Sequence, residues 1–405
     1  MAYYDGEDTV MDALLTANLN RARRPAVAKG EPVISLSGEV IGTKVVDVFD
    51  IPADYAPLYT RHIKSTGETY GGYETELPDG RSLDWYDVIA INTSAGKDSV
   101  ATAIRMVAWA KELGIADRAV FIHADLGDRI EWPDTAAYAA AEAEHLLPGV
   151  RFEIVSRVGT VSDGTSKVNK TYGIKNPPLY AKGEARGDIV DGVIARWKQV
   201  NALADLLDAR GEHEAAAKSR KTPVWPSRAA RSCTKDFKTG PVYVLYTKLA
   251  NEWRERTGET RECRILNCLG IRGAEGDERS KKPSFKHEEK SSSASRHIDT
   301  FYPIHWWSND RVWDEIRKSG APHHWAYDLG MPRLSCPFCV LAGKSALMTA
   351  AKALPERFER YLGAEKTTGS RFATSGKGDW DGSLAGIKRA LEVGETISKV
   401  EGWEG

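Results

Sequence analysis

A short loop of small and polar residues, set between an apolar strand and an apolar helix, constrains this sequence more than any other feature. Val88–Ile91 is apolar throughout, as expected for a strand buried on both faces of a sheet. Ser94–Ser99 forms the loop, and Val100–Leu113 then carries apolar residues at helical spacing. Such a loop lies at the carboxyl end of a parallel strand, where open α/β sheets bind ligands.

The alternation of strand and helix continues after this unit. Ala119–Ala124 is a second apolar run, an alanine-rich helix extends to about Leu147, and Arg151–Val155 is a third strand. Strands that alternate with helices of this length predict a doubly wound, parallel α/β sheet. Further helices are expected at 187–210, 310–319, 345–362 and 384–393, and a mobile serine-rich loop at 281–296.

The residue types of the loop suit an oxyanion. Small residues allow the backbone to approach a phosphate, and the positive end of the following helix attracts it. Lys97 adds a positive charge, while Asp98 is either a magnesium ligand or a carboxylate that stabilises the first helical turn. Ala95 is strained if its position needs a positive φ angle, which favours glycine.

The loop is too short for the Walker pattern, which needs four residues between its glycines. It resembles the PP-loop of ATP pyrophosphatases, usually Ser-Gly-Gly-Lys-Asp-Ser, with Ala95 in place of a glycine. Further segments are similar to motifs of the phosphoadenosine phosphosulfate (PAPS) reductase branch of that superfamily, over about Asp87–Leu362. They are His123–Gly127 with Glu131–Thr135, Arg231–Thr234 with Lys238 and Pro241, Cys268–Glu275 with Arg279, and Arg333–Cys339.

This resemblance implies an adenine nucleotide alpha hydrolase-like fold of the HUP type, with ATP, PAPS or adenosine phosphosulfate (APS) as the bound nucleotide and Mg²⁺ as its ion. Asp125 would hold ribose or magnesium, or simply stabilise a turn. Arg272 and Arg279 would bind an anionic group, or form surface salt bridges. The implied nucleotide-binding residues are Ser94, Ala95, Gly96, Lys97, Asp98, Ser99, Asp125, Gly270, Arg272 and Arg279, with Lys97, Asp98 and Arg272 as the catalytic set.

The expected organisation has four parts. Residues 1–84 form an N-terminal extension with short strands near 32–36 and 44–49, and residues 85–250 form the PP-loop domain. Residues 251–362 form a substrate region that bears cysteines, with a helical character towards its end, and residues 363–405 are a linker and tail.

Four of the five cysteines fall within the motifs. Cys336 and Cys339 have a spacing that lets two thiolates reach one metal, and Cys233 and Cys268 lie in two other motifs. Together they are suited to a [4Fe–4S] cluster or to a tetrahedral zinc ion. A redox disulfide between Cys336 and Cys339, or inert buried thiols, are the alternatives. Cys263 fits no motif and is expected not to be a ligand.

Reductases of this group attack the sulfonate with a cysteine near the C-terminus, but no cysteine follows Cys339. The pattern therefore resembles more closely the DNA-phosphorothioation sulfurtransferases, which implies an ATP-driven sulfur transfer in nucleic-acid modification. A PAPS or APS reductase is the first alternative. The expected partners are an adenine nucleotide, DNA or RNA, and a cysteine desulfurase or thioredoxin-like donor.

Overall charge gives no support for a polyanionic partner, because 56 Lys and Arg balance 57 Asp and Glu. The stretch from Lys218 to Lys238 is locally basic, which fits either a solvated face or a nucleotide-switched nucleic-acid-binding component, the second alternative function. No apolar run is long enough to span a membrane, so a cytoplasmic protein without a membrane partner is expected.

Overall fold

The fold is taken from a computed structural model, which describes residues 77–397 apart from 158–167, 170, 183, 186, 228–229 and 374–379. Four short strands nearer the N-terminus are described by their backbone. They form two antiparallel pairs, β1 (Pro32–Ile34) with β2 (Val40–Thr43) and β3 (Thr60–His62) with β4 (Thr69–Gly71). The strand expected at 44–49 lies outside the described residues.

The centre of the molecule is a six-stranded sheet in the order β11-β12-β10-β5-β6-β7. Five neighbouring strands run parallel, and β11 pairs antiparallel with β12 at one edge. The doubly wound α/β fold expected from the sequence is confirmed. The strands are β5 (Val88–Thr93), β6 (Ala119–Asp125), β7 (Arg151–Ser156), β10 (Cys263–Cys268), β11 (Phe285–His287) and β12 (Arg296–Phe301).

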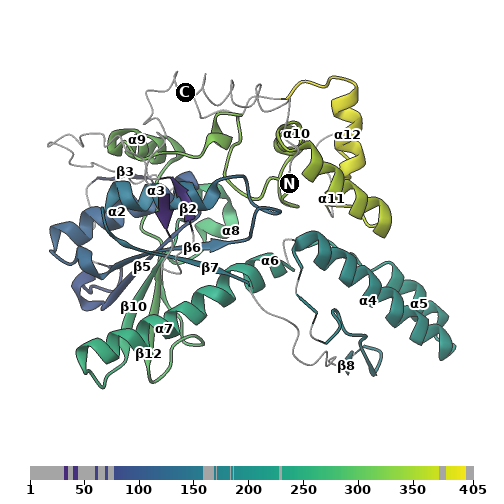
Figure 1. Cartoon of the computed structure of the whole chain (residues 1–405), viewed down its shortest axis with the longest axis horizontal. Coiled ribbons are helices and arrows are strands. Elements are labelled where there is room, and N and C mark those ends of the chain that lie inside the picture. Colours follow the sequence, from purple (N-terminus) through teal and green to yellow (C-terminus); the bar gives the residue numbers. More distant parts are fainter. Residues whose placement is uncertain are drawn as a thin grey trace.

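Helices cover both faces of this sheet (Figure 1). On one face, α2 (Lys97–Glu112) and α9 (Asn309–Ser319) pack over Ile89, Ile91 and other outward-pointing strand residues. On the opposite face, α7 (Gly240–Thr257) packs over Val88, Ala90 and their neighbours. Both faces of β5 are therefore buried, which explains why its sequence is apolar throughout rather than alternating. The helix α3 (Thr135–Leu146) joins β6 to β7.

A second, mostly helical core lies beside the sheet, at the right of Figure 1. It contains α4 (Ile189–Ala209), α10 (Lys344–Ala353), α11 (Pro355–Thr368) and α12 (Leu384–Glu392), and α5 (His213–Arg220) packs on α4. The single helix expected at 345–362 is two helices. Pro355 begins the second one, because proline restricts the residue before it and cannot donate to a continuing helix.

Two other expectations differ from the structure. The boundary expected at residue 250 falls inside α7, and the sheet includes β10 and β12 from the next part of the chain. The serine-rich segment expected to be a mobile loop contains the edge strand β11. In the described part of the chain, no helix combines the length and apolar character needed to cross a membrane.

Candidate active site

The PP-loop-like segment lies where the connections of the sheet change direction. After β5 the chain passes through Ser94–Gly96 into α2 and continues to β6 on one side, whereas β10 flanks β5 on the other side. Crevices at such a switch point, beyond the carboxyl ends of the strands, bind ligands in open α/β sheets. The location expected from the sequence is therefore the one that the fold produces.

A cavity of about 690 Å³ opens at this edge of the sheet. It combines the loop with two segments that carry thiols and lie far away along the chain. Its lining includes Ser94, Gly96, Asp98, Ser99, Gly270 and Arg279 among the expected nucleotide-binding residues, and Cys233, Cys336 and Cys339 among the expected metal ligands. It does not include Ala95, Lys97, Asp125, Arg272 or Cys268, although the structure describes all five.

The loop is held in a tight turn. Ser99 Oγ donates to the Gly96 carbonyl oxygen at 2.8 Å and accepts from the Ser94 amide at 3.1 Å. Ala95 has a φ angle of 55°, in the left-handed region that favours glycine, and its side chain is fully buried. The position that the sequence left conditional therefore does require a positive φ angle.

Replacing Ala95 with glycine should relieve this strain. A left-handed conformation costs a non-glycine residue about 1–2 kcal/mol, which the glycine's greater freedom in the unfolded chain partly offsets. We expect the free energy of unfolding of Ala95→Gly to be unchanged or up to about 1 kcal/mol higher in urea denaturation. The control Ala217→Gly, at an exposed position of α5, should lower it by about 1 kcal/mol. An equal loss of unfolding free energy in the two variants would show that the backbone at Ala95 is not strained.

The two expected catalytic cations are buried at the foot of α2 instead of reaching into the cavity. Arg272 is 4% exposed, and its Nε lies 2.5 Å from Asp98 Oδ1. Lys97 Nζ donates to the Pro332 carbonyl oxygen at 3.1 Å and lies 3.6 Å from the other oxygen of Asp98. Burial lowers the pKa of Lys97. In this structure both residues hold the loop in place, and neither is part of the cavity lining.

Tyr327 connects the loop to the segment that carries two of the thiols. Its buried hydroxyl accepts hydrogen bonds from the Lys97 amide at 2.8 Å and from the Leu334 amide at 3.1 Å. From the sequence, Tyr327 was expected only as one element of the family-like order before Arg333–Cys339, and not as a site residue. A tyrosine that is distant in sequence from the loop gives no local signal of such a contact.

Removing the Tyr327 hydroxyl should weaken both the fold and ligand binding. Tyr327→Phe leaves two backbone donors without their acceptor, which we expect to lower the free energy of unfolding by about 1–3 kcal/mol. ATP affinity, measured by calorimetry, should fall with it. Tyr302→Phe is the matched control, because Tyr302 lines the same cavity but contacts neither segment through its hydroxyl. Similar losses in the two variants would argue against a specific contribution from Tyr327.

Asp125 lies at the end of β6, close to the loop but outside the cavity lining. Its Oδ1 accepts from the Gly127 amide at 2.7 Å, as in the turn that the sequence left as an alternative. Its carboxylate also lies with His123 and Glu131, whose donor atoms are all within 4.8 Å of one another. Burial raises the pKa of Asp125. Arg279, which does line the cavity, pairs with Glu275 four residues earlier.

Three of the four expected thiol ligands line the cavity. Cys233 begins the helical segment before α7, and Cys336 and Cys339 lie in the loop before α10. Burial, and then the neighbouring Cys339, raises the pKa of Cys233, and burial raises that of Cys336 to about 12. Cys268, by contrast, is fully buried in the hydrophobic core between the sheet and α2. The structure therefore does not bring Cys268 to the other three.

A polar floor of the cavity was missed by the sequence analysis. The side chain of Asn267 accepts from Asn92 at 2.9 Å and from Tyr246 at 2.8 Å, and donates to Thr300 at 2.9 Å. All four residues line the cavity. The signal was weak, since Asn92, Asn267 and Thr300 are single polar residues near the ends of three strands and Tyr246 is one residue of α7.

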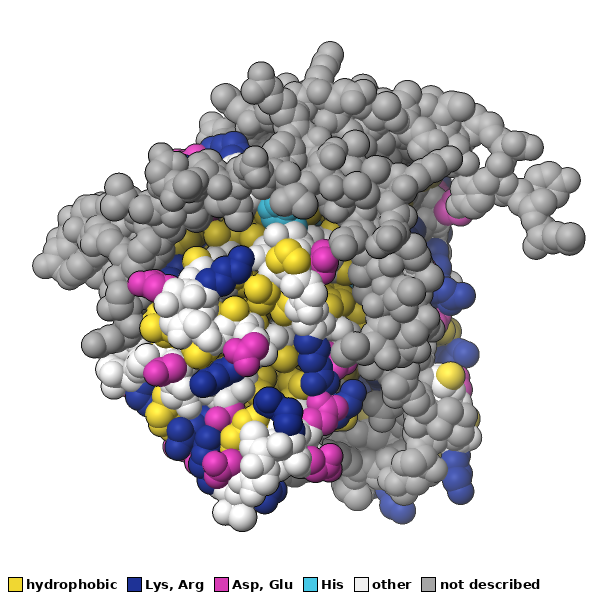
Figure 2. All heavy atoms as spheres, turned by 60° about the vertical axis from the view of Figure 1, so that its left-hand side comes forward, with side chains coloured by type: hydrophobic (Ala, Val, Ile, Leu, Met, Phe, Trp, Pro, Cys, Tyr) yellow, Lys and Arg dark blue, Asp and Glu magenta, His cyan; other side chains and the backbone are white. Residues whose placement is uncertain are grey.

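The cavity has an excess of positive charge. Each of its three carboxylates is paired, Asp98 with Arg272, Glu275 with Arg279 and Glu288 with Lys286. Arg231, Lys238 and Arg333 also line it, from segments far apart in the sequence. On the face shown in Figure 2, by contrast, the coloured Lys and Arg side chains are interspersed with Asp and Glu. The positive excess is therefore a local property that suits an anionic ligand.

Comparisons with known proteins give little direct information. No family model matches the sequence, and no curated protein is significantly similar to it. One solved structure with some likeness is the phosphoadenylyl-sulfate (PAPS) reductase from Candida auris in its phosphate complex. The match has 14% sequence identity, covers 63% of this chain and 85% of that chain, and has a TM-score of 0.31. A likeness of this size carries no conclusion about activity.

Proposed function

We propose that this chain is a PP-loop enzyme, similar to PAPS reductases, that binds ATP, adenylates an acceptor oxygen and transfers sulfur to the activated acceptor. The observation that carries the proposal is a single cavity that contains both the oxyanion-binding loop and three cysteine thiols. A nucleotide loop alone would suit many activities. Thiols within the same cavity suit chemistry in which sulfur and the activated group meet.

The reaction balances without a net oxidant or reductant. The acceptor oxygen attacks the α-phosphorus of ATP, the bond to the bridging oxygen breaks, and pyrophosphate leaves while the acceptor's proton passes to solvent. Hydrosulfide then forms a bond to the activated atom of the acceptor, and AMP leaves with the former acceptor oxygen. Adenylation turns a poor leaving group into a good one, which is the reason to split ATP between its α- and β-phosphates.

Charged groups around the loop suit the phosphates of ATP and their magnesium ion. The positive N-terminal end of α2 stabilises charge on the departing pyrophosphate, as oriented dipoles do at helix N-termini. Lys238 and Arg333, which line the cavity, supply the mobile positive charge that the buried Lys97 does not. Asp98, held by Arg272, lines the cavity at the first turn of α2 and would be the carboxylate to hold a Mg²⁺ ion there.

The three thiols fit a metal centre with one position left open. The donor atoms of Cys233, Cys336 and Cys339 are not all within 4.8 Å of one another, although thiolates on a single zinc ion lie about 3.8 Å apart. A single zinc ion would therefore require the three thiols to move closer together, and we propose a [4Fe–4S] cluster as the centre. Such a centre, when bound, would supply reduced sulfur beside the nucleotide, and the three cysteines would hold and orient it.

The cluster is tested by anaerobic purification, an absorbance spectrum, and iron and sulfide assays. We expect Cys336→Ser to lose iron. Cys263→Ser and Cys268→Ala should retain it, because both residues are buried away from the cavity. A wild-type protein free of iron after reconstitution, or loss of iron in Cys268→Ala, would contradict this ligand set.

The nucleotide site is tested by calorimetric titration with ATP and by pyrophosphate release. Lys238→Gln should weaken ATP binding, whereas Lys235→Gln should not, because Lys235 is exposed on the same short segment outside the cavity lining. Equal binding by wild type and Lys238→Gln would exclude this cavity as the ATP site.

Reduction of PAPS or APS is the second candidate, favoured by the half-buried thiols Cys233 and Cys339 beside a positively charged nucleotide cavity. The two activities differ in their products. Sulfite release from PAPS or APS with a thiol donor, without pyrophosphate release from ATP, would replace our proposal with this one.

The proposed sulfur transfer needs an acceptor and a sulfur donor. We propose a nucleic acid as the acceptor, and a cysteine desulfurase or a thioredoxin-like protein as the donor. The basic stretch 218–238 is not a continuous cationic surface, since Arg220 pairs with Asp205 and Asp208 on α4. Salt-dependent DNA or RNA binding, measured with and without ATP, tests the nucleic-acid partner. No binding at low salt would remove it.

A further inference from the structure

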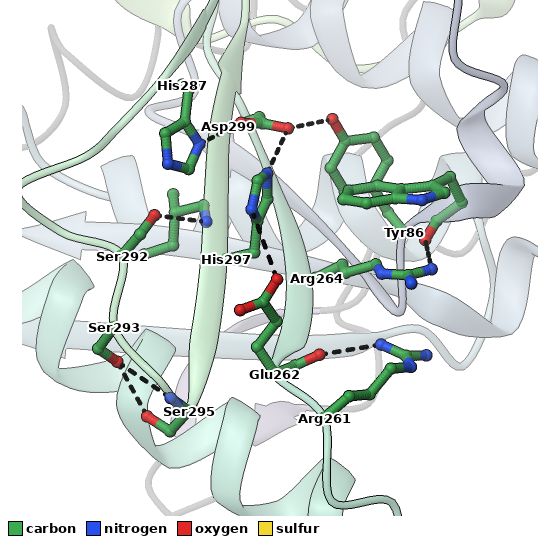
Figure 3. Close-up of polar contacts among 12 residues, drawn as sticks. Tyr86, Arg261, Glu262, Arg264, His287, Ser292, Ser293, Ser295, His297 and Asp299 are labelled. Atoms are coloured by element: carbon green, nitrogen blue, oxygen red, sulfur yellow. Dashed lines mark hydrogen bonds and ion pairs between the residues drawn. The ribbon is translucent and has the colours of Figure 1, made fainter.

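Two histidines and an aspartate converge on the face of the sheet edge opposite the cavity (Figure 3). Asp299, on β12, is fully buried. Its Oδ1 lies 2.7 Å from His287 Nδ1, and its Oδ2 lies 2.9 Å from His297 Nε2. The two imidazole rings are 4.4 Å apart. The three donor atoms all lie within 4.8 Å of one another.

The strand pattern explains why these side chains meet. His297 and Asp299 are two residues apart on β12, so their side chains point to the same face of the sheet. His287, on the neighbouring strand β11, lies directly opposite Asp299. The next pair of residues along these strands, Lys286 and Thr300, points to the other face and lines the cavity. The cluster is therefore separated from the candidate active site by the thickness of the sheet, and nothing in the proposed function uses it.

We propose that His287, His297 and Asp299 form a binding site for a divalent transition-metal ion such as Zn²⁺. Two imidazole nitrogens and one carboxylate form a donor set that such ions prefer, whereas Mg²⁺ and Ca²⁺ prefer oxygen ligands. Tetrahedral zinc ligands lie about 3.3 Å apart, so the present contacts must open by about half an ångström. His287 is 38% exposed, which leaves a path to solvent and room for a water ligand.

Charged and polar groups surround the cluster. His297 Nδ1 lies 3.9 Å from Glu262, a carboxylate that adds negative charge near the ring without a hydrogen bond to it, and Tyr86 donates to Asp299 at 2.7 Å. Arg81 is the competing group. Its guanidinium lies 3.1 Å from Asp299, is 31% exposed, and stacks on Trp85. A bound cation and this guanidinium repel each other, so Arg81 should limit the affinity.

A metal at this position would fix the edge strand. β11 has only three residues and one neighbouring strand, and His287 is its last residue. The residues on either side of His287, Lys286 and Glu288, both line the cavity. An ion shared between β11 and β12 would therefore hold these two cavity residues in place from the opposite face of the sheet.

The test is calorimetric titration of the full chain with Zn²⁺ under reducing conditions, with bound zinc measured after dialysis. We expect His287→Gln to lose one equivalent of zinc. His213→Gln is the matched control, because His213 also has its Nδ1 2.9 Å from a carboxylate but belongs to no such cluster. Cys336→Ser separates this site from the thiols and should retain the equivalent that His287→Gln loses.

Two further variants should change the affinity for zinc in opposite directions. Glu262→Gln should weaken zinc binding, because it removes a negative charge that lies 3.9 Å from His297 Nδ1. Arg81→Gln should strengthen binding several-fold, because it removes the competing charge. Equal zinc content in wild type and His287→Gln would overturn the proposal. So would weaker binding in Arg81→Gln, since that result indicates a hydrogen-bonded cluster that needs its arginine.

Discussion

Replacing Asp98 with alanine is expected to lower the free energy of unfolding by about 3–5 kcal/mol, the range for removing one partner of a buried ion pair. Asp98 is the partner of Arg272 at 2.5 Å and lies 3.6 Å from Lys97. Both cations are nearly inaccessible to water, so without this carboxylate two buried positive charges remain uncompensated. Urea denaturation monitored by circular dichroism measures the loss.

The control for this prediction is an Asp–Arg ion pair that is exposed to solvent on the protein surface. Asp314 lies 2.5 Å from Arg317 on α9, and both side chains are about half exposed. Asp314→Ala should cost less than about 0.5 kcal/mol, because solvent screens such pairs. If Asp98→Ala costs no more than this control, Arg272 is not held by Asp98 in solution. Its assignment as a substrate-binding residue would then regain support.

Replacing Gly270 with alanine is expected to force the loop and α2 away from the turn that follows β10. A Cβ atom at this position would lie 2.5 Å from the Asp98 carbonyl oxygen and 2.8 Å from the Ser99 amide nitrogen. Both are backbone atoms at the start of α2 and have no side-chain freedom. We expect a loss of stability of about 1–3 kcal/mol or more, and loss of ATP binding in calorimetry.

Gly363→Ala is the matched control, since a Cβ at this position in α11 would meet nothing within 4 Å. It should raise stability by up to about 1 kcal/mol, because alanine is the better helix former. If Gly270→Ala had wild-type stability and bound ATP fully, Gly270 could not lie so close to the backbone of Asp98 and Ser99. The sequence analysis placed Gly270 among the nucleotide-binding residues, and the structure adds that its main contact is with the backbone of α2.

Much of the nucleotide half of the fold was predictable because its signals are local. The apolar run of β5, the small residues of the loop and the periodicity of α2 lie within about 25 consecutive residues. The same local reasoning predicted β6, β7 and α4. It failed for β10 and β12, whose membership of the sheet depends on pairing with strands far away in the sequence.

Motif spacing named candidate site residues but gave no information on their geometry. Ser94, Gly96 and the thiols Cys233, Cys336 and Cys339 line the cavity, and their roles stay predictions. Motif spacing contains no information on whether a side chain points into a cavity or into a core. Cys268 shows this, because it lies in a motif yet its thiol is buried among apolar residues at the end of β10.

The sequence by itself determined the strand, loop and helix that form the oxyanion site, because hydrophobic period and small residues act over a few neighbouring positions. Only the tertiary structure decided that Arg272, 174 residues from Asp98, neutralises it, and that Tyr327, 230 residues from Lys97, anchors the loop. It also decided that His287, His297 and Asp299 meet across two strands. Such contacts depend on which strands become neighbours, and that is set by packing of the whole sheet.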